Sequence, residues 1–114
     1  MKIEQTAGRQ AEHVAAQYLL SQGYVIVDQN WRHPRAEIDI IARQGNCLYI
    51  VEVKYRRTVQ QGAGLDYITP AKLQQLRRAL QIWRTSHRWT GEVNLAAIEV
   101  SGPAMRVTAF ITDL

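Results

Sequence analysis

Charged side chains interrupt two strongly apolar segments of the chain. Glu37 and Asp39 lie in the segment AEIDIIA, and Glu52 and Lys54 lie in the segment CLYIVEVKY. Both segments are typical of β-strands, in which alternate side chains share a face. We therefore expect Glu37 and Asp39 to share one face, and Glu52 and Lys54 to share another.

If these strands form a hairpin with the two faces aligned, three carboxylates and a lysine meet in one patch. Carboxylates repel one another unless a proton or a cation compensates their charge, and hard oxygen ligands suit Mg²⁺ or Mn²⁺. A neighbouring lysine such as Lys54 can orient or deprotonate the attacking water and stabilise charge on a phosphate, while the metal polarises the phosphoryl oxygen. This pattern indicates a metal-dependent phosphodiesterase.

A simpler interpretation of the same residues is structural. The polar pairs can lie on a half-solvated face of the sheet, with Glu52 and Lys54 forming an ion pair. In that case the protein is a structural subunit, and the charged residues perform no chemistry.

Basic residues are concentrated in residues 54–88. This segment holds eight basic residues and one acidic residue, Asp66, for a net charge of +7, whereas the rest of the chain is net −3. Such asymmetry suits a polyanion-binding face beside a carboxylate cluster, although basicity also serves solubility. The arginine candidates for phosphate contacts are Arg56, Arg57, Arg77, Arg84 and Arg88. An ordinary solvated helix face is the alternative for the last three.

Hydrophobic periodicity and turn residues predict an α/β domain of order α-β-β-β-α-β-β. The predicted elements are a helix over residues 5–21, strands over 24–27, 36–42 and 47–55, a helix from residue 70, and strands over 93–100 and 105–111. Gly45 marks the turn of a hairpin, and residues 56–68 read as a loop. Thr69 and Pro70 predict the N-cap and first position of the second helix.

Length and composition limit the class of protein. With 114 residues, of which 46% are hydrophobic, we expect a single domain over residues 1–114. The chain holds neither the ~20 consecutive apolar residues of a membrane span nor a signal sequence, so a cytoplasmic protein without a membrane partner is expected. Cys47 is the only cysteine, which excludes a disulfide or multi-thiolate metal site within one chain. We expect it in the core.

Motifs along nearly the whole chain resemble the bacterial YraN family. The matching residues are Gly8, Glu12, Ala15-Ala16-Gln17-Tyr18-Leu19, Gly23, Asn30-Trp31-Arg32, Glu37-Ile38-Asp39, Val51-Glu52-Val53-Lys54-Tyr55-Arg56 and Lys72. That family in turn resembles the PD-(D/E)xK restriction-endonuclease-like nucleases, particularly the archaeal Holliday-junction resolvases. The resemblance implies a three-layer fold in which helices flank a mixed central sheet.

The resemblance also implies residue roles. Asp39 and Glu52 would be metal ligands, and Lys54 would be the catalytic lysine. Glu12 would be an auxiliary carboxylate that reaches the metal or its water, and Lys72 would contact a phosphate. Glu37 would be a lesser neighbour of the site.

Two departures from the family pattern bear on activity. Ala36 stands where the family usually has glycine, and Asn94-Leu95-Ala96 stands where it often has an Arg-Phe-Asp-like segment. The residues implied as metal ligands are intact. We therefore expect a Mg²⁺- or Mn²⁺-dependent endonuclease that hydrolyses DNA, with branched recombination or repair intermediates as candidate substrates. The alternative is a catalytically silent nucleic-acid-binding or protein-interaction module. A junction substrate would require two symmetry-related sites and hence a homodimer.

Overall fold

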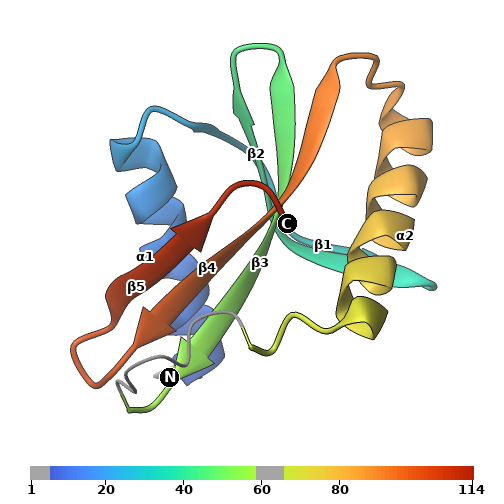
Figure 1. Ribbon diagram of the computed structural model, residues 1–114. Coiled ribbons are helices and arrows are strands. Elements are labelled where there is room, and N and C mark those ends of the chain that lie inside the picture. Colours follow the sequence, from blue (N-terminus) through green and yellow to red (C-terminus); the bar gives the residue numbers. More distant parts are fainter. Residues whose placement is uncertain (1–5, 59–65) are drawn as a thin grey trace, which may run out of the picture.

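The computed structural model describes residues 6–58 and 66–114, and in it a five-stranded mixed sheet lies between two helices (Figure 1). The elements are α1 (Ala7–Ser21), β1 (Val25–His33), β2 (Ala36–Gln44), β3 (Cys47–Arg56), α2 (Pro70–His87), β4 (Glu92–Ser101) and β5 (Arg106–Ile111). The α/β class and the element order predicted from the sequence are confirmed.

The strands lie side by side in chain order, and one neighbouring pair is parallel. β3 and β4 are the parallel pair, whereas the other neighbours are antiparallel. Parallel neighbours need a crossover connection, and α2 supplies it. The predicted hairpin between β2 and β3 is present, with Gly45 at a φ of 60° in its turn. Glycine adopts that backbone conformation more readily than residues with a Cβ atom.

Each helix covers its own face of the sheet. Small residues on α1 allow close approach to the strands, and a larger apolar stripe on α2 fills the opposite face. On the α1 side, Ala11, Ala15, Ala16 and Leu19 pack with Ile40, Val51 and Ile98. On the α2 side, Leu76, Leu80 and Trp83 pack with Ile41, Leu48 and Ile50. The three layers therefore follow from the alternation of apolar side chains along β3.

The sheet forks between β2 and β3. Pairing between these strands runs from the hairpin turn to the pair Ile40 and Val51. Beyond that pair β2 continues beside β1 as far as Ala36, while β3 continues beside β4. Figure 1 shows the tip of β1 and β2 lying beside α2 while β3 runs away from it. The first residues after the last pair are Asp39 and Glu52, so the fork begins at two carboxylates.

β1 differs from its prediction. The sequence predicts a strand over residues 24–27, but the strand runs over Val25–His33. Asp28, Gln29 and Asn30 resemble a loop by composition, and Asn30 has a φ of 52°. A register shift between Ile26 and Asp28 precedes these residues, and from Asp28 onward the pairing with β2 keeps one register across Asn30. Partner strands thus override local β-propensity.

The other boundaries differ from the predictions by one or two residues where they can be compared. Gln5 of the predicted first helix and residues 59–65 of the predicted loop lie outside the described residues. Cys47 is 9% exposed, which confirms it as a core residue. Within the described segments, no helix has the length and hydropathy needed to cross a membrane.

The start of α2 is capped as predicted. Oγ1 of Thr69 accepts a hydrogen bond from the backbone N–H of Lys72 at 3.1 Å, and Pro70 occupies the first helical position. This cap satisfies one of the N–H groups that a helix leaves unpaired, and it fixes the turn that carries Lys72.

Replacing this cap should therefore loosen the start of α2. We expect Thr69→Ala to lower the free energy of unfolding by about 0.5–2 kcal/mol, measured by urea denaturation. Thr69→Ser keeps the hydroxyl and should retain most of the stability. Equal losses in both variants would show that the cap does not hold this turn.

Candidate active site

Asp39 is held at the fork by a backbone hydrogen bond. Its Oδ2 accepts the N–H of Val53 at 2.8 Å, a donor on the strand from which β2 has just separated. The carboxylate thus takes the place of a strand-to-strand hydrogen bond. Val53 follows Glu52 in the chain, so this bond keeps Asp39 beside the second carboxylate.

Burial and mutual repulsion govern the protonation of both carboxylates. Burial raises the pKa of Asp39, while the Val53 N–H and the Lys72 charge act to lower it. Burial and then the charge of Asp39 raise the pKa of Glu52 to about 7. Two half-buried carboxylates that repel one another are each stabilised by a proton or a nearby cation.

Lys72 supplies part of that charge. Its Nζ lies 3.3 Å from Oε1 of Glu52, and the two side chains are 34% and 18% exposed. Lys54 instead has an exposed side chain, with its Nζ 5.8 Å from the centre of the Tyr67 ring. Within the described residues no ion pair joins Glu52 and Lys54, so the interpretation in which these two only pair with each other is wrong.

Glu12 approaches the same site from α1. It lines a cavity of about 150 Å³ together with Asn30 and Asp39. Burial and the Asp39 charge raise the pKa of Glu12, while a hydrogen bond to the Asn30 side chain acts to lower it. The helix position of Glu12 therefore brings a third carboxylate within electrostatic reach of Asp39.

The cavity is also lined by three residues of β1 that the sequence analysis did not place in the site. They are Asn30, Trp31 and Arg32. Asn30 and Arg32 appeared in the sequence only as part of a family resemblance, and the irregular φ of Asn30 could not be foreseen. Nη1 of Arg32 also pairs with Oε2 of Glu37 at 3.0 Å, and both side chains are largely exposed. Glu37 thus lies at the rim of the site.

The carboxylates do not form a closed cage. Across residues 6–58 and 66–114, no three His, Cys, Asp or Glu side chains are grouped so that they could hold a metal ion alone. Mg²⁺ does not need three protein ligands, because it keeps several waters and binds through one or two carboxylates together with substrate phosphates. Asp39 and Glu52, with Glu12 at the edge, fit that donor set.

Tyr67 adds an unusual hydroxyl group near the fork. Its Oη is buried and has no hydrogen-bond partner among the described residues. Burial raises the pKa of Tyr67, and the charges of Glu99 and Glu52 raise it further. The Tyr67 ring also lies near the cations of Lys54 and Arg56, at 5.8 and 5.4 Å from its centre, so Tyr67 packs over the C-terminal end of β3.

The predicted phosphate contacts fall in different environments. Lys72 lies at the carboxylates, whereas Arg57 and Arg77 are exposed. Nε of Arg84 donates to the backbone oxygen of Trp89 at 3.3 Å, and Arg88 ends α2 in a left-handed conformation.

Arg56 is committed to an internal network. Its Nε donates to Oε2 of Glu99 at 2.6 Å, and its other end pairs with Asp66. Glu99 is only 5% exposed and also accepts a hydrogen bond from Thr108 at 2.9 Å. The Arg56 guanidinium therefore compensates a buried charge.

This network separates the roles of two adjacent arginines. We expect Arg56→Gln to lower the thermal unfolding midpoint strongly, because Glu99 would stay buried without its cation. Arg57→Gln removes the same charge from an exposed position and should leave the midpoint nearly unchanged. Circular dichroism during heating measures both, and equal midpoints would refute the structural role of Arg56.

The raised pKa of Glu52 predicts a pH-dependent stability. Between its ordinary value of 4.5 and about 7, the folded protein binds more protons at Glu52 than the unfolded chain. The contribution of Glu52 to stability is therefore lost as the pH rises through that range. In metal-free buffer, the free energy of unfolding of Glu52→Gln should equal that of the wild type near pH 4.5. Above pH ~7 it should exceed the wild-type value by up to about 3 kcal/mol.

Urea denaturation over a pH series measures this difference. Glu92→Gln, which changes an exposed carboxylate at the start of β4, provides the control and should show no such trend. A constant difference between Glu52→Gln and the wild type at every pH would contradict the raised pKa.

Comparison with known proteins places the chain in a family. Residues 11–106 match the model of "Uncharacterised protein family UPF0102". A UPF0102 protein of Leifsonia xyli is 47% identical over 94 residues, which cover 82% of this chain and 80% of the relative. A UPF0102 protein of Kineococcus radiotolerans is 40% identical over 87 residues, covering 76% and 71%. A third, from Flavobacterium psychrophilum, is 38% identical over 93 residues, covering 82% and 78%. The chain therefore belongs to the UPF0102 family, which confirms the YraN resemblance noted in the sequence.

Proposed function

We propose that this protein is a metal-dependent endonuclease that hydrolyses phosphodiester bonds in DNA. The observation that carries the proposal is the fork in the sheet, which holds Asp39 and Glu52 together in a half-buried site beside Lys72. Repelling carboxylates whose pKa values are raised are typical of sites that bind a cation or transfer protons.

Asp39 and Glu52 would hold the metal, and Glu12 would bind it through water from the α1 side. When bound, Mg²⁺ or Mn²⁺ would polarise a phosphoryl oxygen and provide an activated water. The hydrogen bond from Val53 orients the Asp39 carboxylate before any ligand arrives. Such preorganisation of the donor groups is what a metal site requires of its protein.

The two lysines have complementary roles in this proposal. Lys54 follows Glu52 by two residues on β3 and is exposed, so its ammonium group can reach the attacking water or the phosphate. Lys72, one third exposed at the start of α2, can contact a phosphate oxygen on the other side of Glu52. Both cations stabilise charge that develops on the phosphoryl group.

Nucleic acid is the substrate class that the charge distribution supports. The segment from residue 54 to residue 88 has a net charge of +7, and its exposed arginines include Arg57 and Arg77. A polyanion would be attracted to this face while the carboxylates remain at its edge. Branched DNA as a substrate follows only from the family resemblance.

One observation favours a second function, that of a catalytically silent nucleic-acid-binding module. The described carboxylates form no three-ligand group, and Glu52 already pairs with Lys72. A protein that has lost cleavage but kept the fold would show the same ion pair. The two functions differ in one property, metal-dependent strand cleavage.

Cleavage assays on single-stranded, duplex and branched DNA with Mg²⁺ or Mn²⁺ test the proposal. We expect Asp39→Asn, Glu52→Gln and Lys54→Met each to slow cleavage by at least about 100-fold. The asparagine oxygen can still accept the Val53 N–H, so the fold should survive. Asp113→Asn, near the chain end, is the matched carboxylate control and should cleave normally. Wild-type protein that binds these DNAs but cleaves none of them would favour the silent module.

A further inference from the structure

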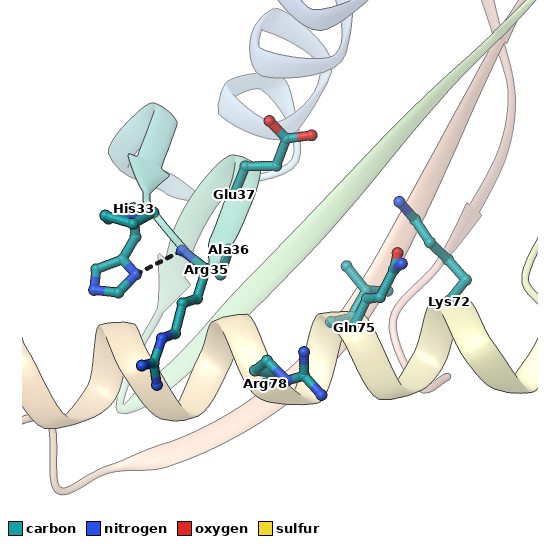
Figure 2. A pocket seen from close by; sticks show the side chains of 9 residues that line it. His33, Arg35, Ala36, Glu37, Lys72, Gln75 and Arg78 are labelled. Atoms are coloured by element: carbon teal, nitrogen blue, oxygen red, sulfur yellow. Dashed lines mark hydrogen bonds between the residues drawn. The ribbon is translucent and has the colours of Figure 1, made fainter.

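A second cavity lies between the turn that joins β1 to β2 and the flank of α2 that carries Lys72, Gln75 and Arg78. It has a volume of about 360 Å³, within the range of about 300–1,000 Å³ that ligand sites occupy. Figure 2 shows Arg35 and His33 on the turn side, with Lys72, Gln75 and Arg78 along the helix. Sequence reasoning assigned no role to His33, Arg35 or Arg78.

Positive charge is concentrated in this cavity. Its lining contains Arg35, Lys72 and Arg78 and a single carboxylate, Glu37. Glu37 is already paired with Arg32, and Lys72 with Glu52. Within the described part of the chain, Arg35 and Arg78 make no ion pair. Cations that converge on a concave surface without internal partners attract an anionic ligand.

The turn that presents Arg35 is itself ordered by local contacts. Nδ1 of His33 accepts the backbone N–H of Arg35 at 3.1 Å, the bond drawn in Figure 2. The His33 ring also stacks on Trp31, with 5.8 Å between the ring centres. These contacts hold the backbone of the turn, so the Arg35 side chain starts from a defined place beside α2.

The cavity continues as a groove along α2. A neighbouring hollow of about 670 Å³ shares His33, Pro34 and Arg35 and extends past Ile82 to Ser86. Its walls combine the apolar surfaces of Pro34 and Ile82 with the polar ends of the helix residues. A charged pocket followed by a more apolar hollow matches the alternation of phosphate and base along one strand of nucleic acid.

The groove is continuous with the carboxylate site. Lys72 lines the groove and also contacts Glu52, and Glu37 lies between Arg32 of the site and the groove. A strand whose phosphate lies at Asp39 and Glu52 would pass its next nucleotide across Lys72 into the groove. Lys72 therefore belongs to both surfaces and connects the carboxylate site to the groove along α2.

We propose that this groove binds the phosphate group of a nucleotide adjacent to the one held at the carboxylate site, with Arg35 and Arg78 contacting that phosphate and the base lying against Pro34 and Ile82. The identity of the ligand as a nucleic-acid strand rests on the proposed function. A free mononucleotide carries the same phosphate and base, and the experiment distinguishes a strand from a free mononucleotide.

Fluorescence anisotropy with a labelled single-stranded oligonucleotide of about 12 nucleotides tests the groove, in EDTA so that no cleavage occurs. We expect Arg35→Gln and Arg78→Gln each to weaken binding about tenfold. The slope of log affinity against log salt should fall by about 0.7 in each variant, the value for one lost phosphate contact on a single strand. Arg106→Gln, on the exposed start of β5, removes an equal charge and should leave the slope unchanged.

Each result decides the proposal. Unchanged affinity and slope in both groove variants would overturn it, even if the wild type cleaves DNA normally. Groove variants that lose binding support it, even if no cleavage is found and the proposed function fails. Thymidine 5′-monophosphate that competes at the same concentration as the oligonucleotide would overturn the assignment to a strand in favour of a free nucleotide.

Discussion

The hydrogen bond from the Val53 N–H to the Asp39 carboxylate is the interaction on which the candidate site depends. At this point β2 leaves β3, and a backbone N–H inside a sheet would otherwise lack a partner. The carboxylate satisfies it and is thereby fixed beside Glu52. The position of the site thus follows from the point at which two strands stop pairing, and the rest of the fold serves to create that point.

The two helices define what surrounds the fork. α1 packs closely through its alanines and brings Glu12 toward Asp39. α2 connects the parallel strands, and its capped first turn places Lys72 on Glu52. The cost of bringing carboxylates together in a half-buried place is partly offset by this lysine. A divalent cation would compensate the charge more completely, because it meets both carboxylates at once.

Much of this arrangement could be predicted from the sequence. Alternation along CLYIVEVKY places Glu52 and Lys54 on one face, and Thr69-Pro70 locates the start of α2. The alternation fails on β2, where Ile38 packs on the α2 side but Ile40 packs on the α1 side. The fork lies between them, and no local pattern encodes where two strands separate. The Lys72 ion pair was missed for the same reason, because it joins residues 20 positions apart.

The arginines show even more clearly that local sequence does not reveal tertiary contacts. Arg56 and Arg57 are alike in sequence, yet one neutralises the buried Glu99 and the other is exposed. Arg77 and Arg78 are also adjacent, yet only Arg78 lines the groove under the β1–β2 turn. Charge counts identified a basic segment, but the partners of each cation depend on tertiary contacts.

The most direct test of the central claim, that the fork is a divalent cation site, is a crystal structure grown with Mn²⁺ and a DNA oligonucleotide and measured at a wavelength that detects manganese. We expect an anomalous peak between Asp39 and Glu52, with the Lys72 ammonium group displaced from Glu52. A site without such a peak, in which Lys72 still pairs with Glu52 while DNA is bound, would contradict it.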